Sequence, residues 1–402
     1  MNKTIAILLD LDDTLLGNDM DQFLPGYLHS LAKFIPDIPE KLLIKELMIG
    51  TKKMITKTTA ALTLAEVFND YFYPAIGKEP RLLANQINKY YQDEFPKLTG
   101  LTTQKQEAIT LVEEIHRIGH PMVVATNPLF PSAAQFHRLA WAGFPAPDGL
   151  FYDVTSFENY HFCKPNPEYY AEIIFKYNFM NMPVVMVGNS LMDDILPAEK
   201  LGLSTFWVNP DDNKHPSQGP LSTAGEICDV LPWIQSIIDK ITPIQWNSTL
   251  EQSIITLNVT PAVFDSYRQN LPFDHLVKKP APEEWSIHEV LQHLLDADNH
   301  LNLARIQKFY SEDKPFITSL DLDDLPNKQP NSAHTYQEVL TNFLSIRTDL
   351  LDLINTASAE IRDKNAVHAI FGPTTFREII EFIAIHDRNH IQQCNHGLTI
   401  SQ

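Results

Sequence analysis

Four short apolar runs, rich in β-branched residues, most constrain the fold of this chain. They are Ile5–Leu9, Pro121–Ala125, Val184–Val187 and Ser204–Val208. Amphipathic segments with helical periodicity separate them, which is the pattern of parallel strands joined by crossover helices. Because the runs are almost wholly apolar, the sheet that they form should be buried on both faces. The sequence therefore predicts an α/β domain, which we place at residues 1–235.

Two further segments are predicted to be helical, since 402 residues exceed one ordinary hydrophobic core. Residues 17–100 follow the first strand without strand patterns, so we expect a helical cap over the edge of the sheet. Strand patterns stop near Gln235, and we expect a linker at 236–246. Beyond it, four amphipathic stretches predict a four-helix bundle over 247–402. These stretches lie at about 249–269, 285–311, 335–356 and 374–396.

Composition narrows the classes of function. The formal net charge of −19 repels phosphate backbones and anionic lipid, so we expect neither nucleic-acid nor membrane binding. Three cysteines without a CxxC pair offer neither a disulfide framework nor a thiolate zinc site. The sequence shows no signal-peptide core and no apolar run long enough to cross a membrane. We therefore expect a cytoplasmic protein.

Two carboxylates follow the first predicted strand directly. Asp10 and Asp12 stand two residues apart after Ile5–Leu9, at the rim where open α/β sheets bind ligands. With Mg²⁺ bound, Asp10 can attack an electrophilic phosphorus atom while Asp12 donates a proton to the leaving oxygen. On this motif alone, the alternative is an ordinary acidic turn or helix cap.

Three later motifs favour the catalytic interpretation. Thr126 ends the second strand with a hydroxyl that can bond a phosphoryl oxygen, and the ammonium group of Lys164 can neutralise carboxylates and phosphate. Asn189 and Asp194 follow a glycine turn after another strand and add oxygen ligands. Each has an alternative role when taken alone: Thr126 as a helix cap, Lys164 as a solvated charge, Asp194 as a partner of a helix dipole. Four such motifs in this order, each at a strand end, are hard to obtain by chance.

These motifs resemble those of the haloacid dehalogenase superfamily over about residues 1–235. The resemblance implies a Rossmann-like core and an aspartyl-phosphate intermediate on Asp10, with Asp12 as general acid and base. The helical cap would close over a small phosphorylated metabolite. Catalysis is expected from Asp10, Asp12, Thr126 and Lys164, substrate contacts from Thr14 and Asn127, and Mg²⁺ binding from Asp10, Asp12, Asn189 and Asp194.

One residue departs from the superfamily pattern. The fourth motif usually begins Gly-Asp, with that aspartate on Mg²⁺, whereas this chain has Asn189. An amide oxygen can bind a hard cation, but a negative charge is lost, so weaker Mg²⁺ affinity and loss of activity both stay open. The dehalogenases of the superfamily are the competing enzyme class. They do not need the second aspartate, so Asp12 favours phosphate chemistry.

Three histidines on two predicted helices form a second cluster. His386 and His390 are four residues apart, so their imidazoles share one helix face, and His293 lies on another helix. Together they can hold Zn²⁺ or Ni²⁺ and leave one position open for water or substrate. The alternative is three unrelated histidines on solvated faces. Two spare ligand candidates are His300 and His368.

The helical region resembles the DinB-like four-helix-bundle superfamily over about residues 247–402. The matching elements are Trp285-Ser286, Phe371-Gly372-Pro373 and the closing His-Asp-x-x-His-Ile-x-Gln that starts at His386. The resemblance implies a metal on His293, His386 and His390. We expect a phosphatase fused to this bundle, with a homodimer formed through the bundle. The rival interpretations are a metal-dependent thiol transferase with a degenerate hydrolase module, and a non-catalytic protein that binds a phosphorylated ligand.

Overall fold

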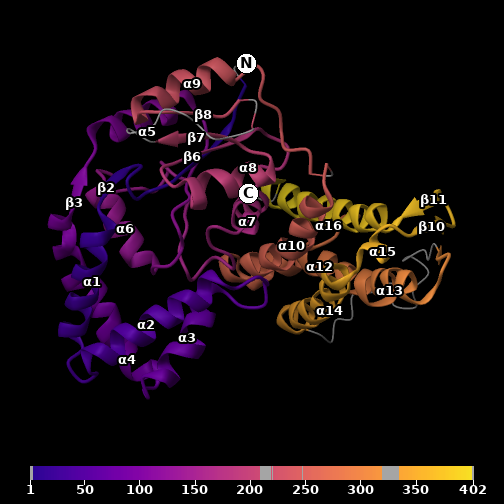
Figure 1. Ribbon diagram of the computed structural model, residues 1–402, viewed down its shortest axis with the longest axis horizontal. Coiled ribbons are helices and arrows are strands. Elements are labelled where there is room, and N and C mark those ends of the chain that lie inside the picture. The colour runs from indigo at the N-terminus through magenta and orange to yellow at the C-terminus, as the bar shows by residue number, and fades with distance from the viewer. Residues whose placement is uncertain (1–2, 209–218, 220, 247, 319–334, 401–402) are drawn as a thin grey trace. The chain divides into compact units, whose positions relative to one another are not determined.

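The computed structural model describes residues 3–208, 219, 221–246, 248–318 and 335–400 (Figure 1). Its contacts divide the chain into two compact units, and the division runs through one helix, α7 (Pro167–Lys176). The first unit comprises Met1–Thr58, Leu62–Tyr170 and Phe179–Ile244, and the second comprises Thr59–Ala61, Ala171–Asn178 and Gln245–Gln402. The domain boundaries expected at 235 and 247 stay a prediction.

The first unit contains a parallel sheet (Figure 1). Within the described residues it has six strands, in the order β5-β4-β1-β6-β7-β8. The strands are β1 (Ala6–Leu9), β4 (Met122–Val124), β5 (Asp153–Val154), β6 (Val184–Gly188), β7 (Ser204–Val208) and β8 (Thr223–Gly225). The predicted α/β fold is confirmed, and all four predicted strands are present. The two edge strands β5 and β8 are too short and too polar to stand out as apolar runs.

The register of β1 brings the predicted motifs to one edge of the sheet. Leu9 lies opposite Val124 of β4 on one side and Val187 of β6 on the other. The residues that follow these three positions therefore emerge together at the carboxyl ends of the strands. One face of the sheet packs its buried Val, Leu and Ile side chains against α5 (Gln106–Ile118) and α9 (Val230–Ile237).

The segment between β1 and β4 is helical almost throughout. It contains α1 (Met20–Phe34), α2 (Glu40–Ile55), α3 (Leu64–Ala75), α4 (Pro80–Lys89), η1 (Tyr90–Glu94) and η2 (Phe95–Leu101). Its core is aromatic, and Phe95 stacks on Trp141 at 5.3 Å between ring centroids. A feature that the sequence did not predict joins its two ends: β2 (Leu16–Asn18) pairs antiparallel with β3 (Thr102–Gln104).

The second unit contains the predicted four-helix bundle. Its long helices are α10 (Leu250–Asn270), α12 (Ile287–Ala297) with its continuation through η5 (Asp298–Asn302) and α13 (Leu303–Ser311), α14 (Tyr336–Thr356) and α16 (Phe376–Ile400). The expectation that strands end near Gln235 was wrong. Three short strands form a small sheet in this unit: β9 (Phe316–Ile317), β10 (Asn365–His368) and β11 (Gly372–Thr375).

Buried ion pairs tie the bundle helices together. Arg347 of α14 donates to Asp298 at 2.7 Å and to Asp387 of α16 at 2.6 Å, and also to the carbonyl oxygen of Leu257 at 3.0 Å. All three charged side chains are almost fully buried, so each depends on the others for compensation of its charge. Within the described residues, no helix combines the length and the apolar character needed to cross a membrane.

Candidate functional site

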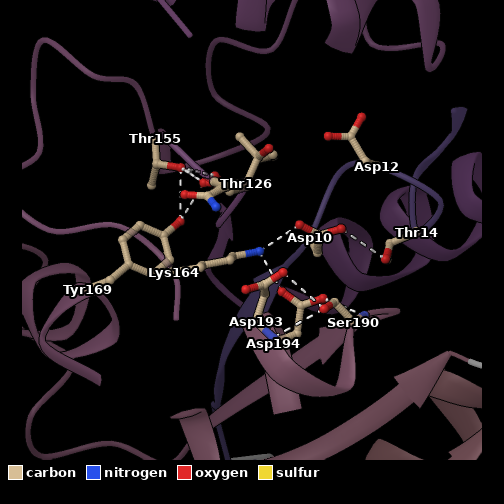
Figure 2. A network of polar contacts seen from close by, with 12 residues as sticks. Asp10, Asp12, Thr14, Thr126, Thr155, Lys164, Tyr169, Ser190, Asp193 and Asp194 are labelled. Carbon is tan, nitrogen blue, oxygen red and sulfur yellow. Dashed lines mark hydrogen bonds and ion pairs between the residues drawn. The ribbon is translucent and has the colours of Figure 1, made fainter. Parts of the chain in front are cut away.

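Lys164 joins two buried carboxylates at the carboxyl end of the central strands (Figure 2). Its Nζ lies 2.6 Å from Oδ1 of Asp10 and 2.5 Å from Oδ1 of Asp194. Asp10 follows β1 directly, Asp194 lies in η3 (Leu191–Ile195) after β6, and Lys164 precedes α7. Three segments far apart in the sequence therefore meet in one ion cluster. Because it is shielded from water, its electrostatic interactions are strong.

One lysine does not balance the two carboxylates. Burial raises the pKa of Asp10 to about 7, and the charge of Asp194 adds to this effect, although Lys164 opposes it. Burial also raises the pKa of Asp194 above its usual value. The cluster therefore favours additional positive charge beside these two side chains.

A glycine turn allows Asp194 to lie against the end of β6. A Cβ atom on Gly188 would sit 2.3 Å from Oδ2 of Asp194, so a larger residue would displace the carboxylate. The backbone N–H of Ser190 donates to the same Oδ2 at 2.9 Å. The Asp194 carboxylate is thus fixed by the backbone on one side and by Lys164 on the other.

The residues between Gly188 and Asp194 are held by their own contacts. The carbonyl oxygen of Asn189 accepts a hydrogen bond from the indole N–H of Trp207 at 2.9 Å. The hydroxyl of Ser190 caps η3 by accepting the backbone N–H of Asp193 at 3.1 Å, and it donates to the Asp193 carboxylate at 3.1 Å. Asn189 thus follows β6 next to the cluster, on an anchored backbone.

Two threonines flank the cluster. The hydroxyl of Thr14 donates to Oδ2 of Asp10 at 3.2 Å, on the oxygen that Lys164 does not contact. Thr126 follows β4, and its backbone carbonyl accepts hydrogen bonds from Thr155 at 2.6 Å and from Tyr169 at 2.7 Å. Both threonines are buried, and Thr126 lies just after the end of β4, where the sequence predicted it.

Asp12 has different partners from Asp10. Its Oδ1 accepts hydrogen bonds from the guanidinium group of Arg138 and, at 2.7 Å, from Nδ2 of Asn18. Figure 2 shows the Asp12 carboxylate apart from the Lys164 cluster. Arg138 lies in α6 (Ser132–Trp141), and its side chain is only 1% exposed. The two predicted catalytic carboxylates are close in sequence, but each pairs with a different cation: Asp10 with Lys164 and Asp12 with Arg138.

Arg138 and Asn18, which hold Asp12, and Asn127, which follows β4, have buried polar atoms without a hydrogen-bond partner among the described residues. Within the described residues, Nε of Arg138, Oδ1 of Asn18 and Oδ1 of Asn127 have no hydrogen-bond partner. Leaving such atoms unpaired is costly. A guanidinium N–H requires an acceptor and an amide oxygen requires a donor, so Arg138 and Asn18 each retain hydrogen-bonding capacity beside Asp12.

Three histidines converge in the second unit as predicted. Nε2 of His386 lies 3.0 Å from Nε2 of His293 and 3.2 Å from Nε2 of His390. Their ligand atoms all lie within 4.8 Å of one another, a spacing suited to a metal ion. Burial lowers the pKa of His293 to about 3 and that of His386 to about 4, with the neighbouring imidazoles adding to the effect. Neutral imidazoles are the form that binds a metal.

Two neighbours orient this cluster. Nδ1 of His390 lies 2.9 Å from Oε1 of Gln393, and a proton on Nδ1 would leave the Nε2 lone pair directed at the other histidines. The ring of Trp285 stacks on His390 with an interplanar angle of 8°. The spare candidates lie elsewhere: His300 is exposed beside Asn299, and His368 binds backbone N–H groups of its own loop.

Comparisons with known proteins match the two parts separately. Residues 6–202 match the family model for haloacid dehalogenase-like hydrolases, and residues 256–394 match that of the DinB superfamily. The chain joins a haloacid dehalogenase-like hydrolase domain to a DinB superfamily domain. Both predicted resemblances, and the prediction of a hydrolase, are confirmed.

Relatives of each domain have been found in bacteria. A phosphoglycolate phosphatase of Vibrio vulnificus is 26% identical over 206 residues, which is 50% of this chain and 82% of that protein. The uncharacterized protein YuaE of Bacillus subtilis is 29% identical over 140 residues, 31% of this chain and 84% of that protein. Among solved structures, a haloacid dehalogenase-type phosphatase from Thermococcus onnurineus has a TM-score of 0.38 at 15% identity, covering 57% of this chain and 96% of that one.

The hydrolase domain offers a set of donors that fits Mg²⁺. Carboxylate oxygens of Asp10 and Asp194 are hard ligands, and the backbone places Asn189 next to them. Burial raises the pKa of Asp10 and the charge of Asp194 adds to the effect, and positive charge beside Asp10 would oppose both. A divalent cation would supply that charge without requiring another side chain.

Sequence reasoning missed two residues of the hydrolase site. Arg138 and Asn18 both hold Asp12, although neither belongs to a motif that the sequence analysis singled out. Arg138 stands in α6 among both polar and apolar residues, so the sequence alone did not single it out. Asn18 ends the short strand β2, which was not predicted either.

Proposed function

We propose that the hydrolase domain is a Mg²⁺-dependent phosphatase for a small phosphomonoester. The observation that carries this proposal is the buried ion cluster in which Lys164 bridges Asp10 and Asp194 at the end of β1. A nucleophilic carboxylate with an adjacent fixed cation suits attack on an anionic phosphoryl group. The match to a phosphoglycolate phosphatase supports a small phosphorylated substrate.

Two steps follow from the placement of the carboxylates. First, an oxygen of Asp10 forms a bond to phosphorus while the bond from phosphorus to the leaving oxygen breaks, and Asp12 gives that oxygen its proton. Second, Asp12 accepts a proton from water as the water oxygen bonds to phosphorus, and the bond to Asp10 breaks. The products are the alcohol and inorganic phosphate, and both carboxylates return to their starting states.

The surrounding residues would stabilise the charges in both steps. Lys164 balances the developing negative charge beside Asp10, and the Thr126 hydroxyl would bond a phosphoryl oxygen, with further contacts from Thr14 and Asn127. Asp10, Asp194 and Asn189, with Asp12 as a fourth candidate ligand, would hold Mg²⁺. The ion would supply charge neutralisation for the phosphoryl oxygens.

We further propose that the bundle binds a divalent metal through its three histidines. The observation that favours this is the approach of three Nε2 atoms to one another. Nε2 of His386 has only one proton or one lone pair to share between two neighbours, whereas a cation would bind the lone pairs of all three imidazoles. Zn²⁺ and Ni²⁺ both suit imidazole ligands. A bundle with thiol-transferase chemistry stays a rival source of activity, and a homodimer through the bundle stays a prediction.

Hydrolysis of p-nitrophenyl phosphate by the full chain, with and without Mg²⁺, tests the phosphatase. Asp10→Asn should abolish Mg²⁺-dependent release of p-nitrophenol while the circular dichroism spectrum stays that of the wild type. Turnover that survives this substitution would reject the mechanism. A phosphomonoester that binds tightly but is never hydrolysed by the wild type would instead favour the non-catalytic interpretation.

A further inference from the structure

A cavity of about 500 Å³ lies within the first unit, lined by cap helices and by the loop before α6. Its volume is typical of pockets that hold a small organic molecule. Leu, Ile, Met, Phe and Tyr side chains make up most of its lining, among them Leu31, Leu47, Phe68 and Phe72. Among the described lining residues, none is a lysine or an arginine, so a carboxylate or second phosphate in this cavity would find no cation.

Several polar groups of the lining already bond to protein atoms. The hydroxyls of Tyr27 and Tyr91 form a hydrogen bond of 2.9 Å with each other. Thr51 donates to the carbonyl oxygen of the residue four positions earlier in its own helix, at 3.0 Å. The carboxylate of Glu158 accepts the backbone N–H and the hydroxyl of Ser132, at 3.0 and 2.9 Å. An apolar occupant leaves all these bonds intact. The amide side chains of Asn69, Asn88 and Gln92 also line the cavity, but they are uncharged and offer a charged occupant no opposite charge.

Two lining residues connect the cavity to Asp12. Met20 accepts a hydrogen bond through its sulfur from Nδ2 of Asn18 at 3.4 Å, and the same Nδ2 donates to Asp12. The ring of Phe130 lies 5.2 Å from the guanidinium carbon of Arg138, which also binds Asp12. The cavity is thus one side chain away from the proposed proton donor to the leaving oxygen. The group attached to that oxygen is the part of a substrate that would reach it.

We propose that this cavity receives the leaving group of the substrate, and that this group is an uncharged alkyl or aryl group. The inference rests on the proposed phosphatase function for its chemistry, since the leaving group is defined by the bond that Asp12 protonates. It names a substrate class: monoesters of phosphate with an apolar alcohol or phenol.

Binding of alkylphosphonates to the wild-type full chain with Mg²⁺ tests this directly. Their carbon–phosphorus bond is not an ester, so affinity is measured without turnover by isothermal titration calorimetry. Octylphosphonate should bind at least tenfold more tightly than ethylphosphonate, because each buried methylene is worth about a fourfold gain in affinity. The compound 3-phosphonopropionate, which adds a carboxylate to the ethyl chain, should bind no more tightly than ethylphosphonate. An octyl-to-ethyl ratio below tenfold, or tighter binding of the carboxylate compound, overturns the proposal.

A matched pair of variants tests whether the alkyl group of the phosphonate binds in this cavity. Ala84 of α4 lines the cavity, whereas its neighbour Asn85 is exposed and does not. Ala84→Phe should reduce the octyl-to-ethyl affinity ratio at least fivefold, and Asn85→Phe should leave it unchanged. An unaltered ratio in a folded Ala84→Phe protein would show that the alkyl group binds elsewhere. If Ala84→Phe does not fold, the octyl-to-ethyl affinity ratio of the wild type still tests the proposal.

The binding series and the turnover assay can fail independently. If the wild type binds octylphosphonate as expected but hydrolyses no phosphate ester, the phosphatase fails and the apolar ligand site stands. If it hydrolyses p-nitrophenyl phosphate but shows no preference for the longer phosphonate, the phosphatase stands and the proposed substrate class is wrong.

Discussion

The guanidinium group of Arg138 donates a hydrogen bond to the carboxylate of Asp12, across 126 positions of the sequence. Asn18 donates to the same carboxylate oxygen, and Gln135 accepts from Nη1 of Arg138 at 2.9 Å. The guanidinium group also lies 5.2 Å from the ring centroid of Phe130, and the side chain is buried. Arg138 therefore holds Asp12 from a fixed position. We assign it as a positioning residue, because proton transfer to a leaving oxygen depends on the orientation of the acid.

Arg138→Gln should lower kcat for p-nitrophenyl phosphate roughly 10- to 100-fold with a smaller change in KM, because Asp12 loses its fixed orientation. Arg138→Lys keeps the charge without the planar fork and should recover part of the loss. Steady-state kinetics on the three proteins measure this. The control is Arg117→Gln, which alters an exposed arginine paired with Glu114 on α5. A kcat for Arg138→Gln within twofold of the wild type would show that Asp12 needs no such support.

The raised pKa of Asp10 predicts how the metal-free protein responds to pH. The pKa is about 7 in the folded chain against 3.8 for an ordinary aspartate, so between pH 4 and 7 the folded state binds more protons than the unfolded state. The free energy of unfolding should therefore decrease as pH rises through this window. Asp10→Asn removes the charge. At pH 7.5 without metal, the free energy of unfolding of this variant should therefore exceed that of the wild type by roughly 1–3 kcal/mol.

Denaturant unfolding in a chelator at pH 4 to 8 checks this expectation. The two proteins should converge near pH 4, where the Asp10 carboxyl group is protonated in the folded chain. A wild type that is more stable than Asp10→Asn at pH 7.5 without metal would show that Lys164 alone compensates the carboxylates.

The sequence could predict the Lys164 cluster because parallel strands bring their carboxyl ends to one edge. Asp10, Thr126 and Asp194 each follow a strand whose apolar run is visible, so their proximity follows from the sheet. It could not predict Arg138 and Asn18. Their contact with Asp12 depends on how α6 and the short strand β2 pack, and no periodicity of the sequence encodes that packing.

The same contrast holds in the bundle. The spacing of His386 and His390 on one helix follows from helical periodicity. Ser286 and Glu289 stand three residues apart, as a capping box requires, and they form one with bonds of 2.8 and 3.2 Å. The strands β9 to β11 escaped prediction because they have only two to four residues and include a glycine and a proline. Their pairing comes from tertiary contacts and not from an apolar run.

His386→Ala should reduce the metal bound per chain by at least half, since His386 lies between the other two histidines of the cluster. Inductively coupled plasma mass spectrometry on the purified, dialysed protein measures the metal. His300→Ala, which removes an exposed histidine of the same bundle, is the control and should retain the wild-type content. Equal metal in both variants would reject the three-histidine site. The phosphatase rate should not change in either.

Arg347→Met should lower the free energy of unfolding of the bundle by about 3–5 kcal/mol, because it leaves Asp298 and Asp387 buried without their cation. The matched control is Arg377→Met, since Arg377 pairs with Glu381 on the surface of α16 and should contribute less than about 1 kcal/mol. Urea unfolding followed by circular dichroism compares the two. A similar, small decrease in the free energy of unfolding of both variants would mean that the buried carboxylates become protonated or hydrated without cost.

Asn189→Asp should lower the Mg²⁺ concentration that gives half-maximal phosphatase activity by roughly tenfold. The substitution adds a negative oxygen ligand beside Asp10 and Asp194, and the backbone of residue 189 is anchored through its hydrogen bond to Trp207. The same change should destabilise the metal-free protein, because three carboxylates would then share the single charge of Lys164. Asn85→Asp, on the exposed side of α4, is the control for the added charge and should alter neither quantity. If Asn189→Asp lowers metal-free stability but leaves the Mg²⁺ requirement unchanged, residue 189 lies near the carboxylates without binding the ion, and the site must be built from Asp10, Asp12 and Asp194 alone.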